Sequence, residues 1–498
     1  MRHTFRALAL AALAFSASPV LAQAVKDTFV ADMPADAATL DPHLQWDTDS
    51  YMVYRNIFDN LVTRNPDGKI VPQIASAWRY ADEKTIEFDI RQDVKFHDGT
   101  ALTIEDVLFS IRRITNPAFK SPQLSQFDQI DSVDAAGPGK MIMKTKSAYP
   151  ALMAQLVKMS IVPKAYVEKV GDQKFNLEPM GSGPFKLKSW QKGVGTNLEA
   201  NDTYWGGKPP FRNVQFRVVP DISTRVADLR TGKADFTRSL TADQAQDLKR
   251  DANLQILSGP TERIGYMFIN ALHGPTDDKR VRQALAYAVD KKTIIEALLQ
   301  GFANPVDVML TPASTGYVAD VKGYPYDPAK AKALIKEAGA EGKVLTFLTS
   351  PVYDARIVQA IQQMLGDVGL KVEIQTMDQP TFLRRRQGRP DEAGNLSLGR
   401  WSCACQDADG VIFPLFRTGG IWSKFSNAEY DKEVDAARVT IDEAKRLTHY
   451  KRAFEILREE MPGLGLYQDY AIYAARKELK WKPTPAESLT LMDMKWQP

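Results

Sequence analysis

Residues 344–374 read VLTFLTSPVYDARIVQAIQQMLGDVGLKVEI, and this stretch decides the fold class. Residues 344–349 fit a strand, and residues 354–368 carry apolar side chains at helical spacing. From Leu370 to Ile374 every second residue is apolar, as in a half-buried strand. A strand, a helix and a strand in this order predict a βαβ-like unit. Strands and helices alternate on both sides of residue 260, so we expect two α/β lobes.

Capping residues predict where several helices begin. Thr103 precedes a helix with carboxylates in its first turn. Asp327-Pro328 opens another helix, because Asp caps well and Pro suits the first helical position. Ser426 with Glu429 reads as a capping box. The segment 278–299 carries apolar residues at near-helical spacing along its whole length and is expected to form one helix.

Length and charge narrow the class of protein. A chain of 498 residues is too long for a single hydrophobic core and suggests two or three domains. Its composition is 44% hydrophobic and 25% charged, which is ordinary for a globular protein. Without residues 1–24 it carries 62 basic and 61 acidic side chains. A net charge this small implies no bulk attraction to nucleic acid or to anionic lipid.

The N-terminus has the pattern of a secretory signal. Basic residues precede an apolar run at 7–15, and small residues close it at 20–24. We therefore expect residues 1–24 to be cleaved. Cys403 and Cys405 are the only cysteines and lie far from the cleavage site, so no lipid-anchored cysteine is expected. The mature protein should be free in the periplasm.

Four runs carry a resemblance to a known family. They are LDP at 40–42, NLVTRNPDGKIVPQIASAW at 60–78, FDIRQDVKFHDGTALTIEDVLFSIRRI at 88–114 and DKRVRQALAYAVDKKTI at 278–294. In this order they closely resemble the signature of the family 5 extracellular solute-binding proteins. That family is the dipeptide, oligopeptide and nickel-binding class that serves ABC importers.

The resemblance implies a two-lobed α/β periplasmic binding protein fold with an additional inserted domain and a ligand cleft between the lobes. The lobes would close about hinges near residues 264 and 470. A monomer would deliver its solute to an ABC permease in the inner membrane, which supplies ATP hydrolysis. The expected parts are lobe one at 25–50, 180–264 and 471–498, the inserted domain at 51–179, and lobe two at 265–470.

Catalytic and metal-binding patterns are missing from the sequence. The five histidines include no pair at metal-ligand spacing. The Gly181-Ser182-Gly183-Pro184 run lacks the pattern of a nucleophile elbow, and no glycine-rich phosphate loop occurs. We therefore expect no enzyme activity, no metal and no cofactor.

The stretch from Gly399 to Gly410 gathers the most unusual side chains, and we interpret it as a wall of the ligand cleft. Trp401 would stack on the ligand. In peptide-binding family members the corresponding Trp is followed three residues later by an Asp that pairs with the peptide's α-amine. Here Ala404 occupies that position, so an ordinary free-amine dipeptide is not the expected ligand.

Several residues of this wall have two possible roles. Asp407 and Asp409 are either ligand carboxylates or parts of a structural turn. Cys403 and Cys405 lie two apart, so in an extended segment both face one side. They form a disulfide, remain reduced and packed, or contact a soft metal or a thiol ligand.

Tyr266 and Asn270 follow the first expected crossover into lobe two. Alternation places them with Phe268 on one face of a strand, where Asn270 offers both a donor and an acceptor. They either contact the ligand or simply pack.

The function expected from these observations is that of a periplasmic binding component of an ABC importer, which captures a peptide-like or small polar solute. The alternatives are a non-peptide ligand such as an opine, an oligosaccharide or a metal chelate. A secreted hydrolase or a periplasmic chaperone is a further alternative from another class.

Overall fold

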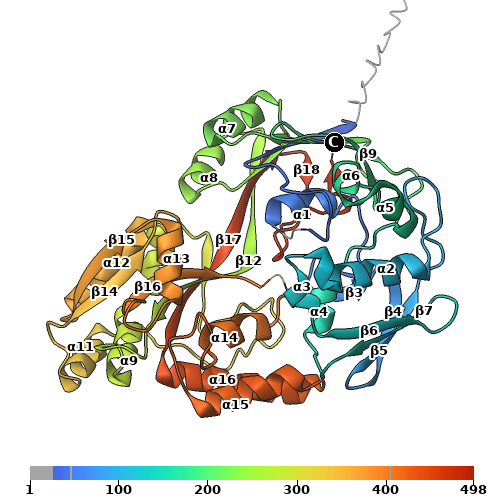
Figure 1. Ribbon diagram of the computed structural model, residues 1–498. Helices are drawn as coiled ribbons and strands as arrows, with labels where there is room; N and C mark the ends of the chain where they lie inside the picture. Colours follow the sequence, from blue (N-terminus) through green and yellow to red (C-terminus); the bar gives the residue numbers. More distant parts are fainter. Residues whose placement is uncertain (1–25, 45–46, 404, 498) are drawn as a thin grey trace, which may run out of the picture.

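The computed structural model describes residues 26–44, 47–403 and 405–497 (Figure 1). The predicted signal at 1–24 and Ala404 lie outside these residues. Most strands join one large sheet in the order β15-β14-β16-β12-β17-β11-β1-β10-β9-β8, and β13 adds to β17. Its strands are β1 (Thr28–Met33), β8 (Phe185–Gln191), β9 (Gly195–Ala200), β10 (Asn213–Val218), β11 (Phe236–Arg238), β12 (Leu254–Ile269), β13 (Ala303–Pro305), β14 (Val344–Thr349), β15 (Lys371–Thr376), β16 (Leu396–Trp401) and β17 (Gly463–Arg476).

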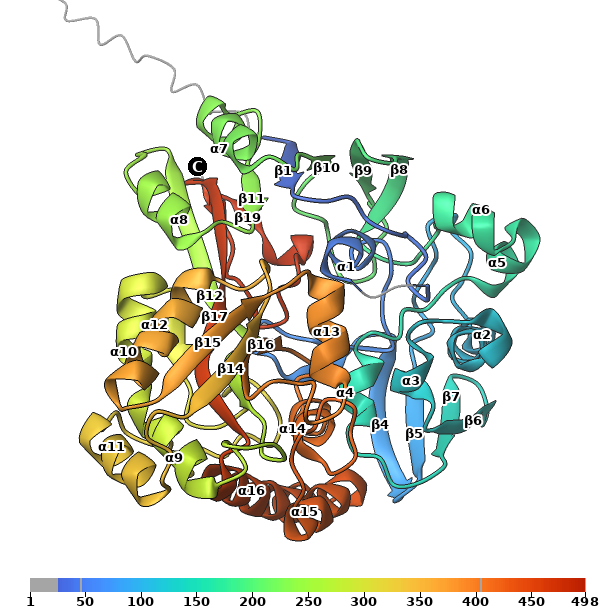
Figure 2. The same ribbon diagram turned by 60° about the vertical axis from the view of Figure 1, so that its left-hand side comes forward.

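Strands β12 and β17 connect the two lobes. They have 16 and 14 residues, pair antiparallel, and run from one lobe into the other in both ribbon views (Figures 1 and 2). Their register shifts between Pro260 and Ile264, close to the predicted hinge near 264. A register shift of this kind bends a strand locally and interrupts its ladder of hydrogen bonds. The midpoint of the longest strand pair is therefore the place where the two lobes meet.

Lobe two contains the predicted βαβ unit. Strands β14 and β15 pair in parallel, and α12 (Ala355–Asp367) connects them. Asp354 caps α12 by accepting a hydrogen bond from the backbone N–H of Arg356. Ile357, Ile361 and Leu365 are buried at helical spacing against the sheet. The prediction from residues 344–374 is confirmed.

A second, four-stranded sheet lies apart from the large one, in the order β4 (Ala75–Asp82), β5 (Thr85–Ile90), β7 (Lys140–Thr145) and β6 (Ile130–Ala135). Helix α2 (Ile104–Thr115) packs on this sheet. Thr103 is the N-cap of α2 and forms a capping box with Asp106. This unit has its own core, built from residues between Leu61 and Ile161.

The core clusters divide the chain differently from the predicted inserted domain at 51–179. Helix α1 (Thr48–Tyr54) and the residues Ile57 and Phe58 belong to the core of lobe one, as do Val162 and Phe175. Their large apolar side chains pack there against strands of the main sheet. Both ends of the predicted inserted domain therefore share a core with lobe one.

Two helix predictions are wrong in detail. The segment 278–299 is not one helix, because α9 (Lys279–Ala288) ends before Asp290, whose side chain caps a new turn by accepting from the Thr293 N–H at 3.1 Å. A cap in the middle of an apolar pattern ends a helix that spacing alone would continue. The N-cap of α15 (Ala428–Val439) is Asn427 instead of Ser426, and it accepts from the Tyr430 N–H at 2.9 Å.

The prediction for Asp327 is confirmed, since it caps α11 (Pro328–Glu337). None of the helices within the described ranges is both long and apolar enough to cross a membrane. The remaining short strands are β2 (Val62–Arg64), β3 (Ile70–Pro72), β18 (Leu479–Lys480) and β19 (Lys495–Trp496). The other helices are α3 (Leu124–Phe127), α4 (Leu152–Leu156), α5 (Lys164–Val170), α6 (Asp172–Leu177), α7 (Ile222–Thr231), α8 (Ala242–Leu248), α10 (Lys291–Thr293), α13 (Gln379–Gln387), α14 (Asp409–Phe416) and α16 (Glu443–Glu460), with a π-helical turn at Ile294–Leu298 and 3-10 turns at Pro117–Phe119 and Leu491–Asp493.

Candidate ligand-binding cleft

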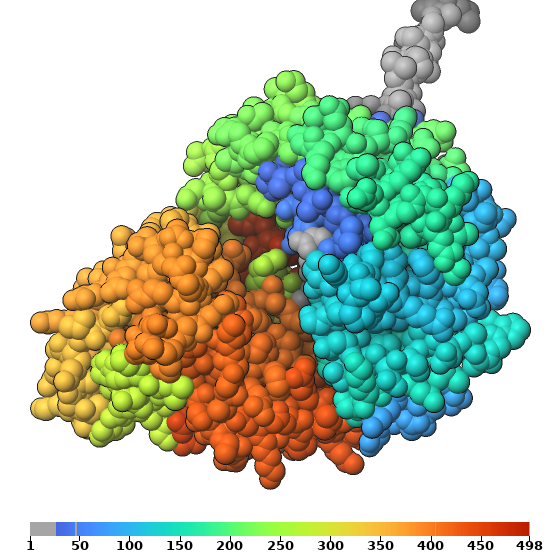
Figure 3. Space-filling model, in the orientation of Figure 1, coloured from blue at the N-terminus to red at the C-terminus, as the bar shows by residue number. Residues whose placement is uncertain are grey.

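A hollow opens where the two lobes and the inserted unit meet (Figure 3). Yellow-green and dark red atoms lie at its base, the colours of the chain near β12 and β17. A cavity between the parts is lined by α1, by the β2 region, by the C-terminal segment and by the loop after β16. Its lining residues include Tyr51, Arg55, Thr63, Arg64, Lys158, Gln406, Thr484, Pro485, Ser488, Thr490 and Asp493. Clefts of this kind between domains are where small ligands usually bind.

The loop after β16 forms one wall of the cleft and joins β16 to α14. A neighbouring segment holds it, because the Thr315 N–H donates to the Gln406 carbonyl at 2.8 Å and the Ala408 N–H donates to the Thr315 carbonyl at 2.9 Å. Gln406 has a φ of 50°, a left-handed conformation that is uncommon for a residue other than glycine. The wall is therefore a tight turn fixed by tertiary contacts.

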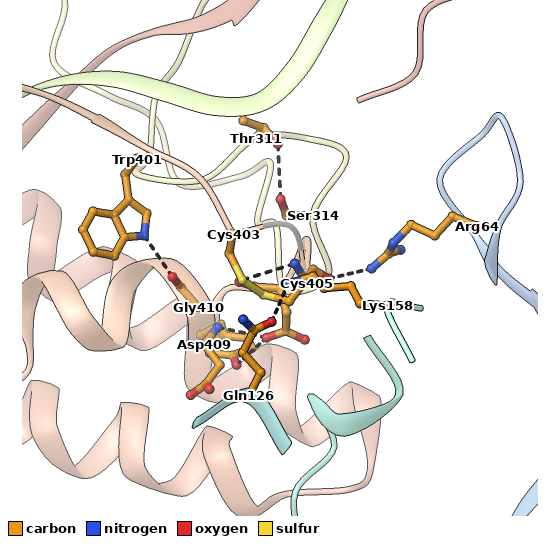
Figure 4. The surroundings of a disulfide bond; sticks show 12 residues. Arg64, Gln126, Lys158, Thr311, Ser314, Trp401, Cys403, Cys405, Asp409 and Gly410 are labelled. Atoms are coloured by element: carbon orange, nitrogen blue, oxygen red, sulfur yellow. Dashed lines mark hydrogen bonds between the residues drawn. A yellow bond between two sulfur atoms is a disulfide. The ribbon is translucent and has the colours of Figure 1, made fainter. Parts of the chain in front are cut away.

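Cys403 and Cys405 form a disulfide in this turn (Figure 4). Their Cα atoms are 5.0 Å apart, within the usual range for a disulfide. Of the three states that the sequence allows for the two cysteines, the structure therefore has the disulfide. The turn packs closely against the start of α14, since a Cβ atom at Gly410 would lie 2.3 Å from the sulfur of Cys403. Position 410 must therefore be glycine. Ala404, between the cysteines, lies outside the described residues.

Trp401 is half-buried at the end of β16. Its indole N–H donates to the Gly410 carbonyl at 2.9 Å, and its ring meets the edge of Trp422 with centroids 5.6 Å apart. In Figure 4 the ring lies on the side of the disulfide away from Arg64. The indole is held rigidly by these contacts, while part of its surface stays accessible.

Asp407 is buried, with 1% of its surface exposed, and faces into lobe two. Its two oxygens accept from the guanidinium of Arg446 at 2.7 and 2.8 Å, and one also accepts from the Tyr450 hydroxyl at 3.3 Å. The backbone N–H of Asp409 donates to the same carboxylate at 2.9 Å. Every oxygen of Asp407 thus has a partner inside the protein.

Asp409 lies at the start of α14 and is also mostly buried. The guanidinium of Arg438 is 3.1 Å from its carboxylate. Burial raises the pKa of Asp409 to about 6, in spite of the opposing charge of Arg438. Both aspartates of the wall therefore pair with arginines of α15 and α16.

Tyr266 lies on β12 and Asn270 follows directly after its end, in lobe two, and both are buried. The Asn270 amide donates to the carbonyls of Pro390 and Gly394 at 2.7 and 2.9 Å and accepts from the Leu272 N–H at 3.1 Å. The Tyr266 ring packs against Gly399, where a Cβ atom would come within 2.4 Å of the ring. These contacts brace β12 against the chain from 390 to 399. The structure does not bring Tyr266 and Asn270 to the cavity lining.

Sequence reasoning missed residues that do line the cavity. Gln406 is 1% exposed, and neither its amide oxygen nor its amide nitrogen has a partner among the described residues. Arg64 reaches across from β2, donating to the Cys405 carbonyl at 2.5 Å and to the Gly68 carbonyl at 2.6 Å (Figure 4). The Nε atoms of Arg64 and Arg55 are likewise buried without a partner in the described part of the chain. No sequence pattern marks an orphaned amide, because its surroundings come from three separate segments.

Burial strongly shifts the pKa of two ionisable groups, one in the cavity lining and one bonded to it through the backbone. Lys158 lines the cavity, donates to the Gln126 side-chain oxygen at 2.7 Å, and has its pKa lowered to about 7 by burial. Glu262 lies on β12 at the register shift, and burial followed by repulsion from Glu487 raises its pKa to about 7. Perturbed groups of this kind gather at functional sites. Within the described ranges, no three His, Cys, Asp or Glu side chains are grouped to hold a metal ion.

The fold and the cleft define a class: two α/β lobes joined by long crossing strands, with a polar cavity between them, as in periplasmic binding proteins. The family model for bacterial extracellular solute-binding proteins, family 5, middle region, matches residues 69–423. The chain belongs to this family, and it is a solute-binding protein of the kind that serves ABC importers.

Known relatives cover nearly the whole chain. Glutathione-binding protein GsiB of Pectobacterium atrosepticum is 30% identical over 483 residues, covering 94% of this chain and 93% of the relative. The ABC transporter substrate-binding protein CtaP of Listeria monocytogenes has a similar fold, with a TM-score of 0.87 and 22% identity over 95% of this chain and 99% of that chain. AgaA of A. tumefaciens R10, in complex with agropinic acid, is 26% identical with a TM-score of 0.73, covering 95% and 99%.

Proposed function

We propose that the mature chain is a monomeric periplasmic receptor, released by cleavage of its signal, that closes its lobes around a peptide-like or small polar solute and passes it to an ABC permease in the inner membrane. The observation that carries this proposal is the group of buried polar atoms without partners around the cavity, on Arg55, Arg64 and Gln406. A buried polar atom without a hydrogen bond costs about 1–3 kcal/mol, so it is kept where a ligand supplies the bond.

Gln406 is the residue best suited to a peptide-like ligand. Its amide has one acceptor and two donor hydrogens, and both ends are unpaired in the described part of the chain. A ligand amide placed against it would accept from the nitrogen and donate to the oxygen. The disulfide of Cys403 and Cys405 would hold Gln406 in position, since Gln406 donates its backbone N–H to the Cys403 carbonyl at 2.7 Å.

The residues predicted from sequence receive two kinds of role in this proposal. Trp401 and the surface around Cys403, Ala404 and Cys405 would contact the ligand. Asp407, Asp409, Tyr266 and Asn270 would shape the wall from behind, because their polar atoms or rings already meet partners in lobe two. The polar atoms involved are those of the ion pairs with Arg446 and Arg438 and of the Asn270 amide.

The named relatives support a polar ligand of modest size. GsiB is named for binding glutathione, a peptide, and AgaA was solved with agropinic acid, which is not a peptide. Closure would occur about the register shift of β12 between Pro260 and Ile264.

The proposal is tested by measuring ligand affinity and the change in the radius of gyration on binding. Calorimetry with glutathione, alanyl-alanine and agropinic acid should show one site for at least one of them, and solution scattering should show compaction on binding. Gln406→Ala should weaken that ligand roughly tenfold, because two hydrogen bonds are lost. Gln363→Ala, a change on the outer face of α12, serves as the control and should bind as the unmodified protein does. No binding in the panel, and no solute carried by protein purified from its own periplasm, would refute the proposal.

A further inference from the structure

A second contact between the lobes lies away from the ligand cavity. The side-chain amide of Gln300 donates to the carboxylate of Asp243 on α8, and the guanidinium of Arg356 lies 3.9 Å from the other oxygen of that carboxylate. The ammonium of Lys249 lies 5.0 Å from the centre of the Phe302 ring. We call these five residues the far-side contact. Asp243 and Lys249 belong to lobe one, and the other three residues belong to lobe two.

The apolar part of the far-side contact is Phe302, which is only 8% exposed. Its ring packs in the same core cluster as Ala245 and Leu248 of α8. The next residue, Ala303, belongs to the core of lobe two and starts β13, which pairs with β17. Gln300 has a φ of 50°, a left-handed conformation that is uncommon for a residue other than glycine. The segment 300–302 is thus fixed to lobe two and reaches lobe one with its side chains.

The far-side contact and the cavity lie on opposite sides of the crossing strands. In both ribbon views β12 and β17 run between α8 and α1 (Figures 1 and 2). Tyr51 and Arg55 of the α1 region line the cavity, whereas none of the five far-side residues belongs to its lining. A rotation about the crossing strands that brings the cavity walls together moves the surfaces on the other side apart. Closure around a solute must therefore separate the far-side contact.

A contact that exists only in the open arrangement opposes ligand binding. The apparent affinity of a ligand falls in proportion to the fraction of the protein that is in the binding-competent arrangement. The exposed ion pair of Asp243 contributes little by itself, but the buried ring of Phe302 adds apolar area to the same contact. On the cavity side, Arg64 donates to the Cys405 carbonyl at 2.5 Å and acts in the opposite sense. Contacts on the two sides of the crossing strands thus oppose each other.

We propose that the far-side contact holds the lobes open in the absence of solute and so sets the affinity of the cleft without touching the ligand. This inference rests on the proposed function, because it concerns the closure of the same cleft. Asp243 and Gln300 are positioning residues in this scheme. Loss of a group that touches the ligand weakens binding, whereas loss of the far-side contact should make binding tighter. The direction of the change therefore distinguishes the two roles.

The experiment compares Asp243→Ala, Gln300→Ala and the double variant with the unmodified full mature protein. Solution scattering should give a smaller radius of gyration for each ligand-free variant, because closed shapes become more populated. Calorimetry with glutathione and alanyl-alanine should show binding about two- to fivefold tighter in each single variant. The double variant should bind within about twofold of the tighter single variant, because both changes remove the same hydrogen bond.

Asp247→Ala is the matched control. Asp247 is exposed on the same helix, α8, and its carboxylate lies 2.8 Å from the guanidinium of Arg230 on α7, inside lobe one. Because this ion pair does not join the two lobes, the variant should match the unmodified protein in radius of gyration and in affinity. Circular dichroism checks that each variant is folded. Since Asp243 and Gln300 lie in different lobes, a folding defect in one variant leaves the other as the test.

The outcomes separate this inference from the proposed function. An unchanged radius of gyration in the folded single variants would overturn the role of the far-side contact and leave solute binding intact. Unchanged or weaker binding of a probe that the unmodified protein binds would overturn it as well. If neither probe binds to any of the proteins, the radius of gyration of the ligand-free variants still decides, since a smaller value supports the far-side contact and an unchanged value refutes it.

Discussion

Asp407 and Glu262 are both buried carboxylates, and they differ in what surrounds them. Asp407, in the wall of lobe two, accepts from both terminal nitrogens of Arg446 and from Tyr450. Glu262, on the crossing strand, keeps an oxygen without any donor among the described residues. Both oxygens of Asp407 have hydrogen-bond donors within the protein, whereas one oxygen of Glu262 has none among the described residues. The difference shows that burial alone does not tell whether a carboxylate is satisfied within the fold; its hydrogen-bond partners do.

The largest effect is expected when the complete pair is broken. Asp407→Asn should lower the free energy of unfolding by about 3–5 kcal/mol, because the guanidinium of Arg446 would stay buried without its counter-charge. Denaturant unfolding followed by circular dichroism measures the loss. The double variant Asp407→Asn with Arg446→Met should recover part of it, since the unpaired guanidinium is then removed as well. A loss below about 1 kcal/mol in the single variant would contradict the comparison.

Replacing Glu262, which has an unpaired oxygen, should instead raise the free energy of unfolding. Glu262 has its pKa raised from 4.5 to about 7 by burial, with Glu487 adding and Arg263 and Lys158 opposing. The folded, ligand-free protein therefore holds a proton that the unfolded chain has released, and stability falls as pH rises between these two values. Glu262→Gln removes this loss. The ligand-free variant should be more stable than the unmodified protein at pH 8, by on the order of 2 kcal/mol.

The same measurement at pH 5 is the internal control. There the folded protein keeps Glu262 neutral, so the variant and the unmodified protein should differ little in unfolding free energy. The pKa of Lys158 is lowered by burial to about 7 and raised by the charge of Glu262, so the loss of this attraction in the variant is part of the difference measured at pH 8. A variant that is less stable than the unmodified protein at pH 8 would show that Glu262 already has a partner within the fold.

The smallest effect is expected at the contact that joins the inserted unit to the wall. Arg64→Ala removes the hydrogen bond to the Cys405 carbonyl, worth about 1 kcal/mol. The ligand-free protein should then populate more open shapes, with a larger radius of gyration in solution scattering and a several-fold weaker affinity. Arg384→Ala, an exposed arginine of α13, provides the control. An unchanged radius of gyration would mean that Arg64 does not contribute to closure.

Much of the fold could be predicted because it depends on local patterns. The strand, helix and strand at 344–374 were recognisable from apolar spacing, and Thr103 and Asp327 from capping chemistry. The helix expected at 278–299 failed for a local reason as well, since Asp290 competes for backbone donors and starts a new turn. The sequence could not show which core the ends of the inserted unit join, because an apolar side chain such as Phe58 can pack in either one.

The candidate site was predictable in position but not in its parts. Two cysteines in a chain with only two, beside a tryptophan, directed attention to residues 401–409. Sequence could not show that Asp407 is satisfied by Arg446, 39 positions away, or that Gln406 has no partner. It also offered no reason to single out Glu262 from the other acidic residues.

The sequence by itself determined the class of fold, the family and the stretch that forms the cleft wall, because spacing, capping and motif are properties of neighbouring residues. Only the tertiary structure decided which polar groups are paired inside the protein and which are left without a partner. That distinction depends on distances between segments far apart in the chain. For Gln406 it is the missing partner, visible only after folding, that carries the functional inference.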